Sequence, residues 1–349
     1  MKTYFLGGTT SEGFKSDFGK ILFSPDNYAY ILKGGPGTGK SSLMKKIAET
    51  FDKTDDIDIY FCSSDINSLD AVVLNKKGIV IVDGTAPHTF DPEYAGARQC
   101  IINLGECWNG EKLKKLSDEI VKVTDENLNW HKRCRRYIKA LSSVNSDIYS
   151  IGESSLDKEK LCKFIERFVK KNIPDKKIGC GESVFKKLSV MTQNGYITME
   201  TGCNNIYILS DGIFAGSDFM LRKLEEYAIA RGYKIIVSNC DLFNGTTYEH
   251  IIIPELDMAL ISSTPLNKNE IKGNKINFSR FYIPAKVSQK KERLAFSKKA
   301  SANLAEEAAY SIKSAKDVHD KIEEYYISAV DFNKINKVAE KLIKEIDKI

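Results

Sequence analysis

The stretch that decides the fold is Tyr28-Ala-Tyr-Ile-Leu-Lys33 followed by Gly34-Gly-Pro-Gly-Thr-Gly39-Lys40-Ser41. Residues 28–33 are an apolar, β-prone run, and residues 40–51 carry apolar side chains at helical spacing. The segment between them fits the pattern G-x-x-x-x-G-K-[ST]. A strand, a glycine loop and a helix in this order are typical of a phosphate-binding loop.

The residues of the glycine loop (34–41) have expected roles beside a nucleotide. Glycines let the backbone wrap closely, so its N–H groups and the first helical turn point at phosphate. Lys40 is expected to contact the β- and γ-phosphates, Ser41 to ligate Mg²⁺, and Ser42 to help hold the α-phosphate. The predicted nucleotide-binding residues are Gly34, Gly35, Gly37, Thr38, Gly39, Lys40, Ser41 and Ser42.

A second apolar run, Gly78-Ile-Val-Ile-Val-Asp83, predicts a buried parallel strand that ends beside the glycine loop. At that edge Asp83 is expected to hold magnesium together with Ser41, by accepting a hydrogen bond from a metal-bound water or from the serine. An aspartate that only caps the strand end is the structural alternative. No glutamate follows Asp83, so the water-activating base of many ATPases is missing from its usual place.

Two further polar residues are expected at the same sheet edge. Asp65 follows a strand that is predicted at residues 57–62, and His88 follows the strand that ends at Asp83. Each could orient a water or take a proton from an acceptor hydroxyl, so they join Lys40 and Asp83 as candidate catalytic residues. The structural alternatives are a helix N-cap before residues 66–72 for Asp65 and a hydrogen-bonded loop residue for His88.

The chain also contains an internal repeat. Tyr207-Ile-Leu209 echoes Tyr30-Ile-Leu32, and residues 258–261 match residues 79–82 at nearly the same offset. The likeness extends to the distal helices, in which Ile335, Val338 and Leu342 fall on Leu161, Phe164 and Phe168.

This register predicts an α/β fold of two tandem P-loop NTPase cores, each a parallel sheet flanked by helices and followed by a helical hairpin. We expect an active unit at residues 1–181, with its hairpin at about 111–172. The second unit is expected at residues 182–349, with its hairpin at about 286–349.

The second unit lacks the chemistry of the first. Asp211-Gly-Ile-Phe-Ala-Gly216-Ser217-Asp218 occupies the register of the glycine loop, and its two aspartates bring negative charge to a cradle suited to phosphate. In this register Lys40 is replaced by Ser217, Ser41 by Asp218 and Asp83 by Ser262. The sequence therefore predicts one functional nucleotide site.

Composition excludes several classes of protein. A chain of 349 residues with 42% hydrophobic residues predicts a globular protein of about two domains. Its net charge of +5 argues against a nucleic-acid partner, and a basic cluster at 131–136 is either a solvated face or a phosphate clamp or nucleic-acid contact. The absence of a long apolar run or a signal-peptide pattern predicts a cytoplasmic protein without a membrane.

Five segments carry a resemblance to a known family: GGPGTGKSS, FCSSDINSLD, IVIVDGTAPHTFDPEYAG, IINLGECWN and EHIIIPEL. Together they resemble bacterial proteins with two tandem P-loop units, which are described as candidate ATPases or nucleotide kinases. The resemblance covers nearly the whole chain and implies nucleotide binding. In that family the second unit often carries its own GK[ST] loop, whereas this chain has DGIFAGSD.

Two function classes follow from these observations. The first is an Mg-ATP-binding P-loop NTPase, either a slow ATPase or a nucleotide-gated switch that moves the helical hairpins. The second is a kinase that transfers the γ-phosphate of ATP to the hydroxyl of a small molecule or nucleotide. ATP or another nucleotide and Mg²⁺ are the expected ligands, and a protein partner or a homo-oligomer stays open.

Overall fold

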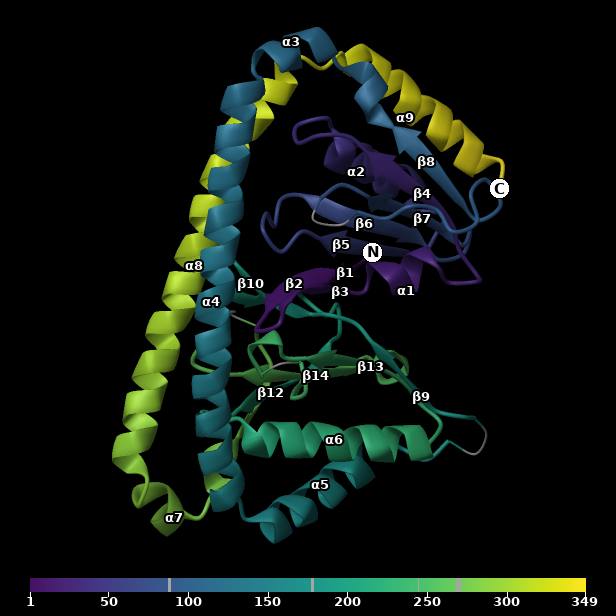
Figure 1. Ribbon diagram of the computed structural model, residues 1–349. Helices are drawn as coiled ribbons and strands as arrows, with labels where there is room; N and C mark the ends of the chain where they lie inside the picture. The colour runs from purple at the N-terminus through teal and green to yellow at the C-terminus, as the bar shows by residue number, and fades with distance from the viewer. Residues whose placement is uncertain (87–88, 177–178, 244, 268–270) are drawn as a thin grey trace. The chain divides into compact units, whose positions relative to one another are not determined.

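The computed structural model describes residues 1–86, 89–176, 179–243, 245–267 and 271–349. These residues form two compact units. Unit 1 comprises Met1–Gly7, Lys15–Arg133 and Tyr310–Ile349, and unit 2 comprises Gly8–Phe14 and Cys134–Ala309. Each unit contains a six-stranded sheet, so the expected α/β class is confirmed (Figure 1).

Unit 1 is built on a mixed sheet rather than the expected parallel one. In spatial order its strands are β1 (Lys2–Phe5), β5 (Ile57–Phe61), β6 (Leu69–Leu74), β7 (Ile79–Asp83), β4 (Tyr28–Lys33) and β8 (Gln99–Asn103). Strand β6 runs antiparallel to both neighbours, and the other pairs are parallel. The alternative in which residues 66–72 form a helix is therefore wrong. The β-prone residues 69–74 (LDAVVL) form a strand instead, and this strand is buried along its whole length.

Helices cover the sheet of unit 1 through a continuous apolar core. Its helical segments are α1 (Phe18–Leu22), α2 (Lys40–Phe51), η1 (Leu104–Cys107), α3 (Gly110–Lys115), α9 (Phe332–Asp347), the start of α4 (Ser117–Ser155) and the end of α8 (Lys291–Ile327). Met44 of α2 and Leu342 of α9 lie in the same core as Ile81 of the central strand. The Tyr30 hydroxyl also donates a hydrogen bond to Glu345 of α9 (3.0 Å).

The sheet of unit 2 has the same strand order and directions. Its strands are β9 (Glu182–Phe185), β13 (Lys234–Asn239), β14 (Tyr248–Ile253), β15 (Met258–Ser263), β12 (Asn205–Ser210) and β16 (Asn274–Asn277). Strand β14 is the antiparallel one, as β6 is in unit 1. Each first strand is also followed by a two-stranded hairpin, β2 (Gly7–Thr10) with β3 (Gly13–Ser16) and β10 (Ser189–Thr192) with β11 (Gly195–Thr198).

The helical segments of unit 2 repeat part of the arrangement in unit 1. They are α5 (Lys158–Asn172), α6 (Ala215–Ala230), η2 (Asp241–Phe243), η3 (Pro254–Leu256), η4 (Phe278–Phe281) and α7 (Pro284–Ser288), with the end of α4 and the start of α8. Helices α5 and α6 lie side by side (Figure 1). The Tyr207 hydroxyl donates to Asn172 of α5 (2.9 Å), which repeats the Tyr30–Glu345 contact of unit 1.

The helical hairpins do not stay with the sheets that precede them in the chain. Helix α4 has 39 residues, begins in unit 1 and ends in unit 2, whereas α8 has 37 residues and does the reverse. Helix α5 therefore packs in unit 2, and α9 packs in unit 1. The compact units thus differ from the contiguous division at 1–181 and 182–349, because a helix of this length extends ~58 Å and carries the chain out of its first unit.

None of the helices in the described part of the chain combines the length and the apolarity that crossing a membrane requires.

Candidate functional site

The glycine loop of unit 1 joins β4 to α2, as the sequence predicts. Strand β4 ends at Lys33, and α2 begins at Lys40. Gly37 and Gly39 have φ angles of 66° and 80°, a left-handed conformation that a side chain disfavours. Gly39 is also the N-cap of α2, so the backbone N–H groups of the first helical turn lie at the end of the loop.

Lys40 folds back over the glycine loop. Its Nζ donates hydrogen bonds to the backbone oxygens of Gly34 (2.9 Å) and Gly35 (2.8 Å), and it lies 3.8 Å from Oδ2 of Asp83. Burial lowers the pKa of Lys40, while the carboxylates of Asp83 and Glu323 act in the opposite sense. The Lys40 ammonium group is therefore surrounded by oxygen atoms at the loop, where it could also contact a bound anion.

Asp83 and Ser41 bring two oxygen donors to the same sheet edge. Asp83 ends β7 and pairs with Leu32 at the end of β4. Its Oδ1 accepts hydrogen bonds from the backbone N–H (2.9 Å) and the hydroxyl of Thr85, which fixes the carboxylate. The Ser41 hydroxyl accepts a hydrogen bond from the backbone N–H of Leu69 (3.0 Å). Carboxylate and hydroxyl oxygens are suitable ligands for Mg²⁺.

Asp70 is a buried carboxyl group at this edge that the sequence analysis does not single out. It precedes Ala71, which pairs with Val82, so it lies beside Asp83 across the ladder between β6 and β7. Burial and the charge of Asp83 raise the pKa of Asp70, and a hydrogen bond with Cys62 lowers it; the resulting pKa is about 7. An acidic residue inside the apolar run LDAVVL is the signal that could have found it.

The structure gives Asp65 a local role. Its carboxylate accepts hydrogen bonds from the backbone N–H of Asn67 (3.0 Å) and the hydroxyl of Ser68 (2.9 Å), and it forms an ion pair with Lys316 of α8 (3.6 Å). These contacts stabilise a turn before β6, so the predicted helix N-cap is wrong. His88 lies outside the described residues, and its assignment stays a prediction.

Thr38 and Ser42 lie in different surroundings. Thr38 makes a contact within the loop, whereas Ser42 lies at the surface. The Thr38 hydroxyl donates to the backbone oxygen of Gly35 (2.8 Å) and so helps to close the loop. Ser42 is exposed on the first turn of α2. Its expected contact with the α-phosphate stays a prediction.

The C-terminal part of α8 packs directly on the glycine loop. A Cβ at Gly35 would lie 2.4 Å from the ring of Tyr326, and one at Gly37 would lie 3.0 Å from the backbone oxygen of Glu323. Tyr326 in turn packs near Trp108, with ring centroids 5.6 Å apart. The glycines are therefore needed both for the bend of the loop and for the close approach of α8.

The counterpart loop of unit 2 (residues 211–218) contains its own anion. The Asp211 carboxylate accepts hydrogen bonds from the backbone N–H groups of Ile213 (3.1 Å) and Ser217 (2.9 Å). The Tyr282 hydroxyl donates to the same carboxylate (2.8 Å) and accepts from the N–H of Gly216 (2.7 Å). Phe214 has a φ angle of 66°, equal to that of Gly37 in unit 1.

Asp218 accepts a backbone hydrogen bond as Ser41 does in unit 1, but through a carboxylate and not a hydroxyl. The N–H of Tyr248 donates to its carboxylate (2.7 Å), where the N–H of Leu69 donates to Ser41 in unit 1. The Tyr149 hydroxyl (2.8 Å) and Arg222 (3.0 Å) bind the same carboxylate. Asp218 is thus engaged with neighbouring side chains.

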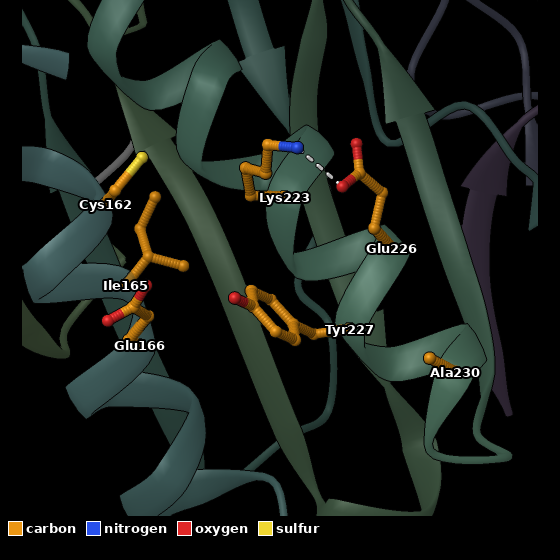
Figure 2. Close-up of a pocket in the computed structure, with 7 residues that line it drawn as sticks. All are labelled: Cys162, Ile165, Glu166, Lys223, Glu226, Tyr227 and Ala230. Carbon is orange, nitrogen blue, oxygen red and sulfur yellow. Dashed lines mark hydrogen bonds and ion pairs between the residues drawn. The ribbon is translucent and has the colours of Figure 1, made fainter. Parts of the chain in front are cut away.

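The hollow drawn in Figure 2 lies between α5 and α6 of unit 2 and has a volume of about 370 Å³. Two of its charged lining residues, Lys223 and Glu226, form an ion pair with each other (2.7 Å). A groove of about 780 Å³ lies along α4, where Arg135 and Arg136 of the basic cluster and the nearby Lys139 meet Glu12 and several serines. Neither hollow involves residues of the counterpart loop.

We compared the chain with protein-family models, curated proteins and solved structures, and none of these three comparisons gave a match. The function of the site therefore has to follow from its own residues.

Proposed function

We propose that unit 1 binds ATP together with Mg²⁺ at the glycine loop, and that the protein is a P-loop NTPase. Either the site hydrolyses ATP slowly, or the nucleotide acts there as a switch that moves the long helices. The tandem P-loop family suggested by the sequence is part of this proposal. The second core is then a relative of the first that no longer binds nucleotide.

The main support is the position of Lys40 relative to Asp83. The lysine sits on the loop between two backbone carbonyls, 3.8 Å from the carboxylate that ends the neighbouring strand. A triphosphate on the loop would offer Lys40 better partners than these neutral carbonyls, because charge-assisted hydrogen bonds are the stronger ones. The start of α2 adds backbone N–H groups and a helix dipole that favours negative charge.

The available oxygen donors fit a magnesium ion. Among the described residues no group of three or more His, Cys, Asp or Glu forms a metal site. Mg²⁺ beside a nucleotide needs only one or two protein oxygens, since water and phosphate complete its shell. Ser41 and Asp83 would hold the ion, which would neutralise the charge that develops on the phosphates.

The contacts of unit 2 support a single site per chain. The N–H groups of Ile213 and Ser217 already bind the Asp211 carboxylate, so a phosphate would have to displace a covalently tethered anion. Asp218 would also repel it. Unit 2 is therefore proposed to support the fold and the long helices.

An assay of ATP loss tests this function. The full chain is incubated with ATP and Mg²⁺, alone and with a library of hydroxyl-bearing metabolites, and free phosphate is scored separately from phosphorylated product. We expect free phosphate in the absence of any metabolite, and none from Lys40→Ala. Product formed only with an acceptor would identify a kinase instead, and a wild type that neither binds nor consumes nucleotide would refute the proposal.

A further inference from the structure

The sheet edge of unit 1 leaves one catalytic role unfilled. Hydrolysis of ATP needs a group that orients the attacking water, and no glutamate follows Asp83. Asp65 is engaged in its own turn and with Lys316, and Asp70 is buried on β6 with a carboxyl whose pKa is raised to about 7.

Helix α8 brings another carboxylate to the glycine loop. The backbone of Glu323 lies against Gly37, since a Cβ there would be 3.0 Å from the Glu323 oxygen and 3.4 Å from its Cα. Its carboxylate lies near enough to Lys40 to act on the charge of the lysine. The Glu323 side chain is 37% exposed, so water can reach it. This residue is 240 positions from Asp83 in the chain and joins the site only through α8.

Two neighbours on α8 lie close to this carboxylate. Nε2 of His319, one turn earlier, lies 3.9 Å from Oε1 of Glu323, and burial lowers the pKa of that histidine. Lys316, a further turn back, is anchored by ion pairs with Asp65 and Asp320 and lies within electrostatic reach of Glu323. Lys316, His319 and Glu323 are spaced so that they lie on one face of α8.

We infer that Glu323 is the catalytic base of the ATPase proposed above. Its carboxylate accepts a proton from a water whose oxygen forms a bond to the γ-phosphorus. The bond from that phosphorus to the β–γ bridging oxygen breaks, and ADP leaves with the electron pair. The proton then passes from Glu323 to the released phosphate or to solvent. The inference rests on the proposed function, because it assigns a residue to that same site.

The test compares Glu323→Gln with Glu324→Gln in the full chain. Glu324 is the next residue on α8 and is exposed, so it is a matched control for charge, helix propensity and position. ATP affinity is measured by calorimetry with Mg²⁺, and phosphate release is measured at saturating ATP. For Glu323→Gln we expect kcat to fall by about 100-fold or more, with the Kd for ATP changed less than about 3-fold. Glu324→Gln should keep kcat within about 2-fold of wild type.

The outcomes separate this inference from the binding proposal. A Glu323→Gln protein that keeps its turnover, gains turnover, or loses binding and turnover in parallel overturns the role as base. A wild type that binds ATP but releases no phosphate also overturns it and leaves the nucleotide site intact. Failure of the wild type to bind ATP removes the proposed function itself. A Glu323→Asp variant that recovers part of the activity of a folded protein supports the role and argues against a packing effect.

Discussion

The hydroxyl of Tyr282 donates a hydrogen bond at 2.8 Å to the carboxylate of Asp211, the first residue of the counterpart loop of unit 2. In the repeat register Asp211 corresponds to Gly34 and Tyr282 to Trp108. A carboxylate thus replaces a hydrogen atom at the first position of the loop, and it binds the N–H groups that a phosphate would use. Together with the replacement of Lys40 by Ser217, this carboxylate explains why two sheets of equal topology are expected to differ in ligand binding.

Removing this internal anion should destabilise the protein. In Asp211→Ala the buried N–H groups of Ile213 and Ser217 and the Tyr282 hydroxyl lose their acceptor. We expect the free energy of unfolding to drop by roughly 2–4 kcal/mol, measured by denaturant titration. The exposed Asp317→Ala serves as control and should change stability by less than about 0.5 kcal/mol. An Asp211→Ala protein as stable as its control would contradict the assigned contacts.

A second prediction concerns pH and the buried Glu249 of unit 2. Burial raises its pKa from 4.5 to about 7, although the Tyr196 hydroxyl donates to its carboxylate (2.6 Å) and lowers the pKa in part. The folded state therefore binds the proton more tightly than the unfolded state. The resulting stabilisation is complete below pH 4.5 and is lost as the pH rises through 7.

Glu249→Gln removes this titration and leaves the neighbouring His250 in both proteins. Stability of the wild type relative to the variant should fall by up to ~3 kcal/mol between pH 4.5 and pH 8. Chemical denaturation of both proteins across that range measures the difference. A difference that does not vary with pH would show that folding leaves the pKa of Glu249 unchanged, and would contradict this prediction.

Asp83→Asn tests the predicted metal contact. The amide keeps the shape of the side chain but loses the negative charge that would hold a hydrated cation. We expect Mg²⁺-dependent turnover to fall by at least about 10-fold, while nucleotide binding without metal changes little. Both quantities are measured on one preparation, with and without a chelator. Equal losses under the two conditions would indicate that Asp83 only caps the strand.

The local part of the site could be predicted from sequence because its residues are consecutive. The loop 34–41 and the apolar run ending at Asp83 each carry a pattern that specifies the backbone on its own. Strand β6 escaped prediction because residues 69–74 look equally apolar in a strand and in a buried helix. Glu323 and Tyr326 could not be placed from sequence, since only the path of α8 brings them to the loop.

The path of the long helices also changes what a truncated protein should do. The segment 1–181 lacks α9, whose Leu342 and Ile346 complete the core of unit 1 beside Tyr30. That segment should therefore be poorly soluble, with a thermal midpoint at least about 10 °C below that of the full chain. In the full chain, Leu342→Ala should cost about 2–5 kcal/mol of unfolding free energy. A soluble 1–181 segment of unchanged stability would show that α9 is dispensable.

Calorimetric titration of the full chain with ATP and Mg²⁺ tests the central claim most directly. The wild type, Lys40→Ala and Ser217→Lys are titrated under the same conditions. We predict a stoichiometry near one for the wild type, no measurable binding for Lys40→Ala, and still one site for Ser217→Lys, because Asp211 and Asp218 continue to oppose phosphate in unit 2. Two sites in the wild type, or unchanged binding by Lys40→Ala, would contradict a single nucleotide site at the glycine loop.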